Sequence, residues 1–412
     1  MRVLCCVTTA VSHARALLPV ARALACAGHE VLVATTVPLL RVFDGEPFRA
    51  RADLPPLIPD VSPALAEAGR GAGEDAATLA RKVGVRLFAG PHIVEGYHAL
   101  AAVADRFRPD LVLRGEAEFA AVLLAEDLGV PHVPAPAGSA NALPPDYLLV
   151  LLNERRRELG RPEWDDLEPL YRHGRLDFMP ASYSFAPAHL PDAITCRQPD
   201  AVDRAEVLPD WVLALPADRP LVLASFGTVI SVLHAQAVDP FTVAVQADTR
   251  SALLAVVAAL AETDCVGVVA TGGLVPADSP VPGNVRLADH VPQPLLLRCA
   301  QLFITHGGYN GIRESIAAGV PMAVLPRYGD QFANAARVRE LGLGLHVTDG
   351  SAGAIAAACR TLLDDAAVTA RARLAQRHML ALPPVEDLVP RLERIAAGTG
   401  TPVPVGTGAP VP

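Results

Sequence analysis

The sequence FITHGGYNGIRE, residues 303–314, decides the fold class of this chain. Its apolar start, up to Thr305, predicts a buried β-strand. Gly307 and Gly308 follow directly, and glycine lets the backbone turn sharply and pass close to a ligand without a Cβ in the way. A helix is expected to begin immediately afterwards, so the stretch predicts a strand, a tight turn and a helix, which is the basic unit of an α/β fold.

An anion site is predicted where this helix begins. Helix N-termini present unpaired N–H groups and about half a positive charge, so a phosphate group is stabilised there without many basic side chains. The backbone of Gly308, Tyr309 and Asn310 would hold the phosphate, and His306 adds a ring N–H donor beside it. His306 could also be an ordinary core histidine, but the adjacent glycines leave space that a ligand explains better.

The rest of the composition fits an α/β protein of two domains. At 412 residues the chain is too long for one ordinary core and suits two domains of about 200 residues each. The runs 111–113, 221–223 and 266–269 are apolar at every position, as expected for parallel strands that helices cover on both faces. We therefore expect parallel sheets in both halves.

The charge of the chain argues against nucleic acids and anionic membranes as partners, and its cysteines indicate a reducing compartment. The net charge is −9, from 44 acidic and 35 basic residues, and no block of five basic residues occurs. Nucleic acids and anionic membranes need such clusters, so we expect neither as a partner. The seven cysteines have no C-x-x-C spacing and lie mostly in apolar segments, which indicates buried free thiols in a reducing cytoplasm.

The first residues predict a buried strand and no targeting segment. The apolar run after Arg2 breaks at Ser12 and His13, too early for a secretory signal or a membrane-spanning helix. We expect a strand over 2–10, a helix over 15–27 and a second strand over 30–36, with His13 on the first crossover loop. Lysine is nearly absent while Ala, Arg and Pro abound, which suggests a GC-rich, actinomycete-like bacterial source.

The motif at 303–314 resembles the nucleotide-sugar signature of family 1 glycosyltransferases, the bacterial antibiotic type with the GT-B fold of two facing Rossmann-like domains. The stretches that carry the resemblance are Ala318 to Pro321, Leu325-Pro326, Asp330 to Ala335, Ser225 to Thr228, His290 to Gln293, and near the start His13, Leu17 to Leu24 and Gly28 to Val31. In order and spacing they cover most of the chain.

This resemblance implies a division of labour between the domains. We expect an N-terminal acceptor-binding domain over 1–205 and a nucleotide-sugar domain over 206–379. A helix over 380–397 would return to the first domain, and the Gly/Thr/Pro/Val tail over 398–412 is expected to be disordered. Residues 138–190 have an irregular helical pattern, and 231–250 are longer than the usual connection of the family.

His13 is the predicted catalytic base. The loop after the first strand lies at the carboxyl end of a sheet, where open α/β folds bind ligands. An imidazole can take a proton from an acceptor hydroxyl as that hydroxyl attacks the anomeric carbon. In many relatives an aspartate after the strand at 111–113 orients this histidine. Here that aspartate is missing, and Glu116 is the nearest substitute, although Glu at a helix start is often only a favourable partner of the helix dipole.

The donor site is expected on the second domain. The resemblance makes His306 a diphosphate ligand and Glu314 the ligand of the ribose hydroxyls. Asp330 and Gln331 could hold sugar hydroxyls by paired acceptor and donor contacts, with an ordinary helix N-cap as the alternative for Asp330. The remaining candidates are Ser225 and Thr228 for phosphate or sugar oxygens, and Val291 and Gln293 for the base.

The predicted reaction is an inverting, metal-independent sugar transfer. A TDP- or UDP-linked deoxysugar would pass to a hydroxyl of an apolar natural-product aglycone, with no cofactor other than the nucleotide sugar as co-substrate. No metal motif is evident, so the helix terminus and His306 would stabilise the leaving group. A nucleotide-sugar epimerase on the same fold and a catalytically silent sugar-nucleotide-binding partner are the alternatives, and a homodimer remains open as the assembly.

Overall fold

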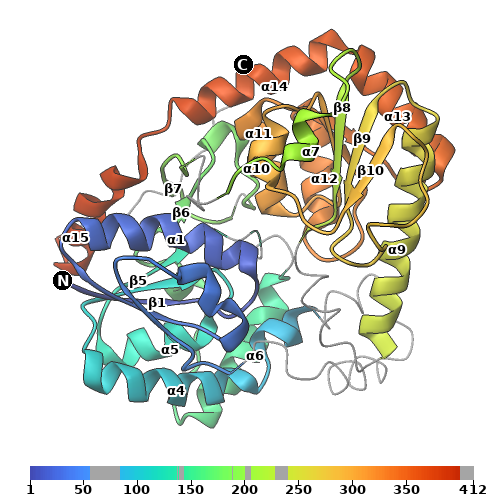
Figure 1. Ribbon diagram of the computed structural model, residues 1–412. Coiled ribbons are helices and arrows are strands. Elements are labelled where there is room, and N and C mark those ends of the chain that lie inside the picture. Colours follow the sequence, from blue (N-terminus) through green and yellow to red (C-terminus); the bar gives the residue numbers. More distant parts are fainter. Residues whose placement is uncertain are drawn as a thin grey trace. The chain divides into compact units, whose positions relative to one another are not determined.

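Two parallel β-sheets organise the chain, as the computed structural model in Figure 1 shows. The structure describes residues 1–55, 84–136, 138, 143–187, 189–199, 206–227 and 240–399. Its contacts divide the chain into one unit of residues 1–199 with 382–412 and a second unit of residues 200–381. The chain is therefore divided after residues 199 and 381, where the sequence analysis expects boundaries after residues 205 and 379.

The first unit contains a sheet of order β3-β2-β1-β4-β5, in which every pair is parallel. The strands are β1 (Arg2–Cys6), β2 (Glu30–Ala34), β3 (Arg49–Arg51), β4 (Leu111–Gly115) and β5 (His132–Ala135). The helices of this unit include α1 (Val11–Cys26), α4 (His92–Phe107), α5 (Phe119–Leu128) and α6 (Pro145–Glu158), with the short helix η1 (Val37–Phe43) after β2. Leu4, Cys6 and Val112 are fully buried against α4 and α5. The alternate residues Val3, Cys5 and Leu113 are also fully buried, so the sheet has the two-sided burial that its sequence predicts.

Smaller elements complete the first unit. They are the parallel pair β6 (Arg175–Asp177) and β7 (Ala193–Thr195) and the short helices η3 (Glu168–Leu170) and η4 (Ala181–Tyr183). At the end of the chain, η5 (Val385–Leu388) packs against α1 and is followed by α15 (Val389–Ala396). The N–H of Arg197 donates to the Pro383 carbonyl oxygen at 2.7 Å, and His29 Nε2 lies 3.0 Å from Glu393 Oε1. These contacts fix the last helix to the first unit.

The second unit contains a sheet of order β10-β9-β8-β11-β12-β13, again parallel throughout. Its strands are β8 (Leu221–Ser225), β9 (Val266–Ala270), β10 (Val285–Ala288), β11 (Leu302–Thr305), β12 (Met322–Val324) and β13 (Gly344–His346). Its helices are α7 (Asp210–Leu213), α9 (Pro240–Ala261), α10 (Gln293–Leu297), α11 (Tyr309–Ala318), α12 (Gln331–Glu340), α13 (Ala352–Asp364) and α14 (Ala366–Leu380).

Local sequence explains where these helices begin and end. Asp365 caps α14, because its Oδ1 accepts hydrogen bonds from the N–H groups of Ala367 and Val368 at 2.8 and 3.0 Å. Gly319 ends α11 in the left-handed conformation at φ +72°, which glycine adopts without steric cost. The start of α14 and the end of α11 are thus encoded by the local sequence.

Several expected bounds are wrong. The strand expected over 2–10 ends at Cys6, so His13 lies in the first turn of α1 and not on a loop. The helix expected from Glu116 begins at Phe119. The helical pattern over 138–190 includes strand β6. Of the supposed extra sequence at 231–250, residues 240–250 belong to α9 and the remainder lies outside the described residues, as does the expected tail from residue 400.

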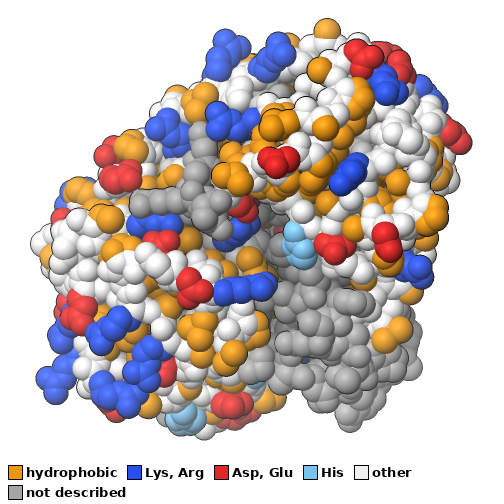
Figure 2. Space-filling model, viewed as in Figure 1, with side chains coloured by type: hydrophobic (Ala, Val, Ile, Leu, Met, Phe, Trp, Pro, Cys, Tyr) orange, Lys and Arg blue, Asp and Glu red, His pale blue; other side chains and the backbone are white. Residues whose placement is uncertain are grey.

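The surface and the cysteines add two observations. In Figure 2, acidic and basic side chains are interspersed on the face shown, with no extended basic area among the described residues there. None of the described helices has the length and apolar character that a membrane span requires. All seven cysteines are free, but Cys26 and Cys299 are exposed, contrary to the expectation of buried thiols.

Candidate functional site

The turn between β11 and α11 has the geometry of an anion site. Gly307 adopts φ +90°, and a Cβ there would lie 2.7 Å from Val324 Cγ1, so the position requires glycine both conformationally and sterically. Thr305 Oγ1 accepts a hydrogen bond from the Gly307 N–H at 3.2 Å and fixes the turn. Gly308 is the N-cap of α11 and supplies no side-chain cap, which leaves the helix N-terminus open to an external acceptor.

The His306 ring lies between two glycines at this turn. A Cβ at Gly308 would lie 2.6 Å from His306 Nε2, and one at Gly227 would lie 2.8 Å from His306 Cε1. Burial lowers the pKa of His306 to about 4, and the Ser225 backbone opposes that shift only in part. The ring is therefore neutral at pH 7 and carries one N–H, and its Nδ1 atom is buried without a hydrogen-bond partner among the described residues. The absence of a Cβ at Gly227, after β8, and at Gly308 thus leaves room for the neutral imidazole between them.

Asn334, on α12, ties a neighbouring loop to the same turn. This side chain is fully buried, and its Nδ2 donates to the Gly307 carbonyl oxygen at 3.0 Å and to Asp330 Oδ2 at 2.8 Å. One side-chain amide thereby holds together the turn at Gly307 and the carboxylate of Asp330. Sequence reasoning gave Asn334 no role, although it stands in the stretch from Asp330 to Ala335 that carries the resemblance.

Gln293 and Glu314 come together from α10 and α11. Gln293 Nε2 donates to Glu314 Oε2 at 2.7 Å, and Arg313 Nη2 lies 3.3 Å from Glu314 Oε1. The Glu314 side chain is 19% exposed, so its carboxylate is oriented by two partners while it stays accessible. The structure therefore brings together the residues predicted for the base and for the ribose.

Asp330 and Gln331 have different environments. Asp330 occupies the N-cap position of α12, as the alternative interpretation expects, but its side chain forms no cap hydrogen bond. It is half-buried and bound to Asn334. Gln331 is 2% exposed, and its Oε1 accepts hydrogen bonds from the N–H groups of Arg327 and Tyr328 at 2.8 and 3.1 Å. Its side-chain oxygen shapes the loop, whereas Asp330 is better placed to meet a ligand.

The remaining donor-side candidates have the following places. Ser225 ends β8, pairs in register with Thr305 and is 8% exposed. Val291 is half-buried just before α10. The Tyr309 side chain is 5% exposed, so this residue would contribute backbone and not its ring. Thr228 lies outside the described residues, and the structure adds nothing to its prediction.

In the first unit, His13 is the third residue of α1. The N-cap of this helix, Ala10, forms no side-chain cap hydrogen bond. The His13 side chain is half-buried, and burial lowers its pKa to about 4. An imidazole with that pKa is unprotonated at pH 7 and can accept a proton. The described residues form no hydrogen bond with the His13 ring, so no carboxylate is seen to orient it.

Glu118, and not Glu116, is the buried carboxylate near the end of β1. Its Oε1 accepts from the Thr8 N–H at 2.6 Å, from Thr8 Oγ1 at 2.7 Å and from Thr9 Oγ1 at 3.4 Å. Glu118 is 5% exposed, and burial raises the pKa of its carboxyl against the effect of these bonds. It therefore fixes the segment that leads from β1 into the helix of His13.

Glu116 stands in the turn before α5, and the expectation that it starts this helix is wrong. Its carbonyl oxygen accepts a hydrogen bond from Arg114 Nη1 at 2.5 Å. The Arg114 guanidinium is fully buried and also donates to the Leu170 carbonyl oxygen at 2.6 Å and to His132 Nδ1 at 3.3 Å. Burial lowers the pKa of Arg114 to about 10, and the cluster holds β4, β5 and the segment at Leu170 together.

Among the described residues, no group of three or more His, Cys, Asp or Glu side chains could hold a metal ion. The chemistry that the described residues offer is thus a neutral imidazole and a helix N-terminus for an anion, two oriented carboxylates for hydroxyl groups, and in the other unit a second neutral imidazole that can accept a proton.

Comparisons with known proteins place this chain. Residues 254–395 match the family described as erythromycin biosynthesis protein CIII-like, C-terminal domain. The L-demethylnoviosyl transferase of Streptomyces niveus is 30% identical over 374 residues, which cover 89% of this chain and 90% of that protein. Among solved structures, the spinosyn rhamnosyltransferase SpnG has a TM-score of 0.74 at 25% identity, with 96% of this chain and 100% of SpnG covered.

A further solved structure is the glycosyltransferase VinC in complex with DTDP, with a TM-score of 0.68 at 25% identity and coverage of 97% of this chain and 100% of VinC. These proteins are named as transferases, which does not favour the epimerase or the silent partner. The chain thus belongs to the family 1 glycosyltransferases with the GT-B fold, of the type found in bacterial antibiotic biosynthesis.

Proposed function

We propose that this glycosyltransferase moves a deoxysugar from a TDP- or UDP-sugar to a hydroxyl of an apolar natural-product aglycone, with inversion at the anomeric carbon and without a metal ion. The observation that carries the proposal is the neutral His306 ring held between Gly227 and Gly308 at the uncapped start of α11. Such a site suits a diphosphate, because N–H donors meet its charge.

The donor would be held by the second unit. The α11 N-terminus and His306 would bind the diphosphate, Glu314 the ribose hydroxyls, and Asp330 the sugar hydroxyls. A thymidine nucleotide is the favoured choice, since the VinC structure contains DTDP. The name of the Streptomyces niveus relative, a demethylnoviosyl transferase, supports a modified sugar as the transferred group.

His13 would act as the general base. The acceptor O–H proton passes to the neutral imidazole while the acceptor oxygen bonds to the anomeric carbon. The bond from that carbon to the diphosphate oxygen breaks on the opposite face, and a single displacement of this kind inverts the configuration. The nucleoside diphosphate leaves with its charge stabilised by the His306 N–H and the α11 terminus, which is electrostatic catalysis by fixed dipoles.

The donor screen is the direct test of this proposal. Purified protein would be incubated with TDP-, UDP- and GDP-sugars, with and without excess EDTA, and release of nucleoside diphosphate would be followed. We expect turnover of a TDP- or UDP-sugar that EDTA leaves unchanged. Loss of activity on EDTA that Mg²⁺ or Mn²⁺ restores would contradict the metal-free part, and turnover of GDP-sugars alone would contradict the choice of nucleotide.

Two further parts of the proposal concern the cell. We infer a cytoplasmic enzyme that carries no cofactor besides the nucleotide sugar, with a homodimer as an assembly to be tested by light scattering. Five of the seven cysteines are buried free thiols, and this supports a reducing compartment. Cell fractionation with an antibody to the chain tests the location.

A further inference from the structure

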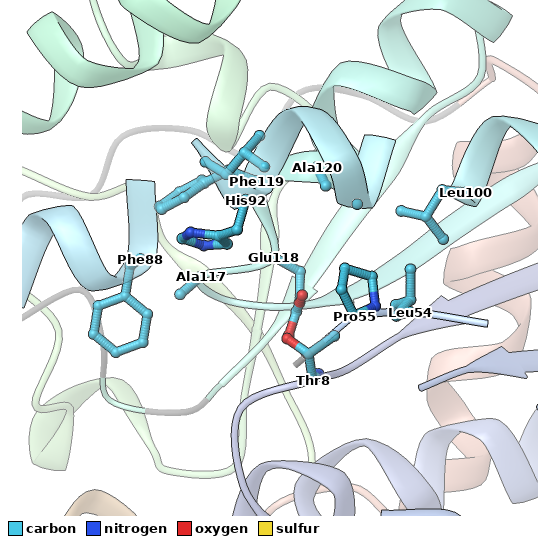
Figure 3. Close-up of a pocket in the computed structure, with 12 residues that line it drawn as sticks. Thr8, Leu54, Pro55, Phe88, His92, Leu100, Ala117, Glu118, Phe119 and Ala120 are labelled. Carbon is cyan, nitrogen blue, oxygen red and sulfur yellow. The ribbon is translucent and has the colours of Figure 1, made fainter. Parts of the chain in front are cut away.

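The first unit contains a small pocket that combines an apolar wall with three polar side chains (Figure 3). Its lining residues come from the segments after β1 and after β3, from Phe88 and the N-terminal part of α4, and from the turn into α5. The polar ones are Thr8, His92 and Glu118. The open space is about 20 Å³, enough for one water-sized group, so the pocket suits a single functional group and not a whole molecule.

His92 offers this pocket a lone pair. Its Nε2 atom is buried, and the described residues provide no hydrogen-bond partner for it. The His92 ring has a backbone hydrogen bond with Phe88, one turn earlier, and because Nε2 has no partner the proton is assigned to Nδ1. Burial, with a smaller effect of Arg155, lowers the pKa of His92 to about 4, so at pH 7 the ring is neutral and Nε2 is an acceptor.

Glu118 offers lone pairs as well. All hydrogen bonds of its carboxylate with the described residues, to Thr8 and Thr9, involve Oε1. The other carboxylate oxygen, Oε2, has no such bond. In Figure 3 the His92 ring and the Glu118 carboxylate both lie among the apolar side chains that line the pocket. Of these two acceptors, the buried His92 Nε2 lacks a donor, which costs free energy that a ligand carrying an O–H would recover.

We propose that this pocket is a specificity subsite for the acceptor, and that it takes a hydroxyl group carried on an apolar ring. The hydroxyl would donate its proton to His92 Nε2 or Glu118 Oε2, while the ring contacts the apolar rim that includes Leu54, Phe88 and Phe119. The inference rests on the proposed function in one respect, since it takes the ligand of this pocket to be the acceptor substrate of the proposed reaction. An O-methyl ether at the same place would have no proton to donate and would be rejected.

The test compares 2-naphthol with 2-methoxynaphthalene as probes, by ligand-observed NMR titration of the whole protein without donor. We expect 2-naphthol to bind the wild type more tightly. His92→Phe keeps the ring volume and removes the acceptor, so it should weaken 2-naphthol binding by about three- to tenfold and leave 2-methoxynaphthalene unchanged, as the loss of one neutral hydrogen bond implies. His98→Phe, on the exposed face of the same helix, is the matched control and should behave as wild type.

A second variant reverses the chemistry of the pocket. Glu118→Gln can keep its oxygen on Thr8 and turn an NH₂ donor toward the pocket, so the preference should shift toward 2-methoxynaphthalene, which offers an acceptor oxygen. Equal binding of the two probes by the wild type, or an unchanged ratio in both variants, would overturn the subsite. Donor turnover is measured separately. If the enzyme is active but fails the binding test, only the subsite is refuted; if it is inactive but passes the binding test, only the proposed reaction is refuted.

Discussion

At the scale of single residues, the two site histidines are shaped mainly by burial. The pKa values of His13 and His306 are both lowered to about 4, yet the residues serve different chemistry. In the proposed reaction a neutral His306 would donate its N–H to the diphosphate without adding a full charge, and a neutral His13 would accept the acceptor proton. Burial would then prepare one imidazole as a donor and the other as a base.

The pH dependence of the reaction should follow the protonation of the His13 imidazole. A general base acts in its unprotonated form, and the pKa of His13 is about 4. We therefore expect kcat/KM for the acceptor to be flat from pH 6 to 8 and to fall only as the pH approaches that value. His13→Ala should lower kcat by about 10² to 10⁴ with donor affinity nearly unchanged. A rate that halves near pH 6.5, or a fully active His13→Ala enzyme, would contradict the assignment.

A substitution at Gly227 separates strain from contact. Gly227 adopts φ +80°, and a Cβ there would press on the His306 ring, whereas Gly28 adopts φ +87° with nothing within 4 Å. Both glycine-to-alanine variants carry the strain of a left-handed alanine, about 1 kcal/mol. Only Gly227→Ala should also weaken TDP binding, by about tenfold, because it displaces the ring. Equal TDP affinity in the two variants, measured by calorimetry, would show that His306 does not touch the nucleotide.

At the scale of elements, the sequence predicted the strands and the turn at Gly307 and Gly308 because their signals are local. An apolar run before Gly307 and Gly308 is sufficient to place β11, the turn and α11. The start of α5 could not be placed in the same way. Glu118 forms its hydrogen bonds with Thr8, which lies 110 positions earlier, and nothing near Glu118 reveals that partner. The sequence therefore indicates Glu116, which stands nearest to the position of the missing aspartate.

Contacts with distant parts of the chain also explain why the sequence analysis assigned no role to two other residues. Asn334 gains its role from the Gly307 carbonyl oxygen, 27 positions away, and His92 gains its role from a pocket built by four separate segments. Family resemblance could have marked Asn334, because the matching stretch contains it. No pattern in the sequence marks His92. Contacts between distant segments are what the sequence, taken alone, could not supply.

The link from α12 to the turn at Gly307 can be tested through Asn334. Asn334→Ala removes the donor that serves Gly307 and Asp330, and we expect it to lower the free energy of unfolding by about 1–3 kcal/mol and to weaken TDP binding. Asn284→Ala is the control. Asn284 Nδ2 donates to Leu260 and Cys265 carbonyl oxygens before β10, at the opposite edge of the same sheet. The Asn284→Ala variant should be less stable than the wild type but should bind TDP with unchanged affinity. Weaker TDP binding in Asn284→Ala together with unchanged binding in Asn334→Ala would contradict the link.

At the scale of the whole molecule, the buried histidines predict sensitivity to acid. The pKa values of His13, His92 and His306 are lowered to about 4, against about 6.5 in an unfolded chain. The unfolded state therefore binds more protons below pH 6.5, and stability should fall as the pH drops from 6.5 toward 4. The melting temperature by circular dichroism should decrease over this range, and less steeply in His92→Phe than in His98→Phe. Parallel curves for these two variants would show that His92 is not buried as described.

The whole account depends most on the site at the start of α11, and calorimetric titration of TDP tests that site most directly. The wild type should bind TDP, and His306→Ala, shown to be folded by circular dichroism, should bind it about ten- to a hundredfold more weakly, the loss expected for a hydrogen bond to a charged group. A folded His306→Ala protein that binds TDP with wild-type affinity would contradict the account, because the histidine would then be a structural part of the turn and not a ligand of the diphosphate.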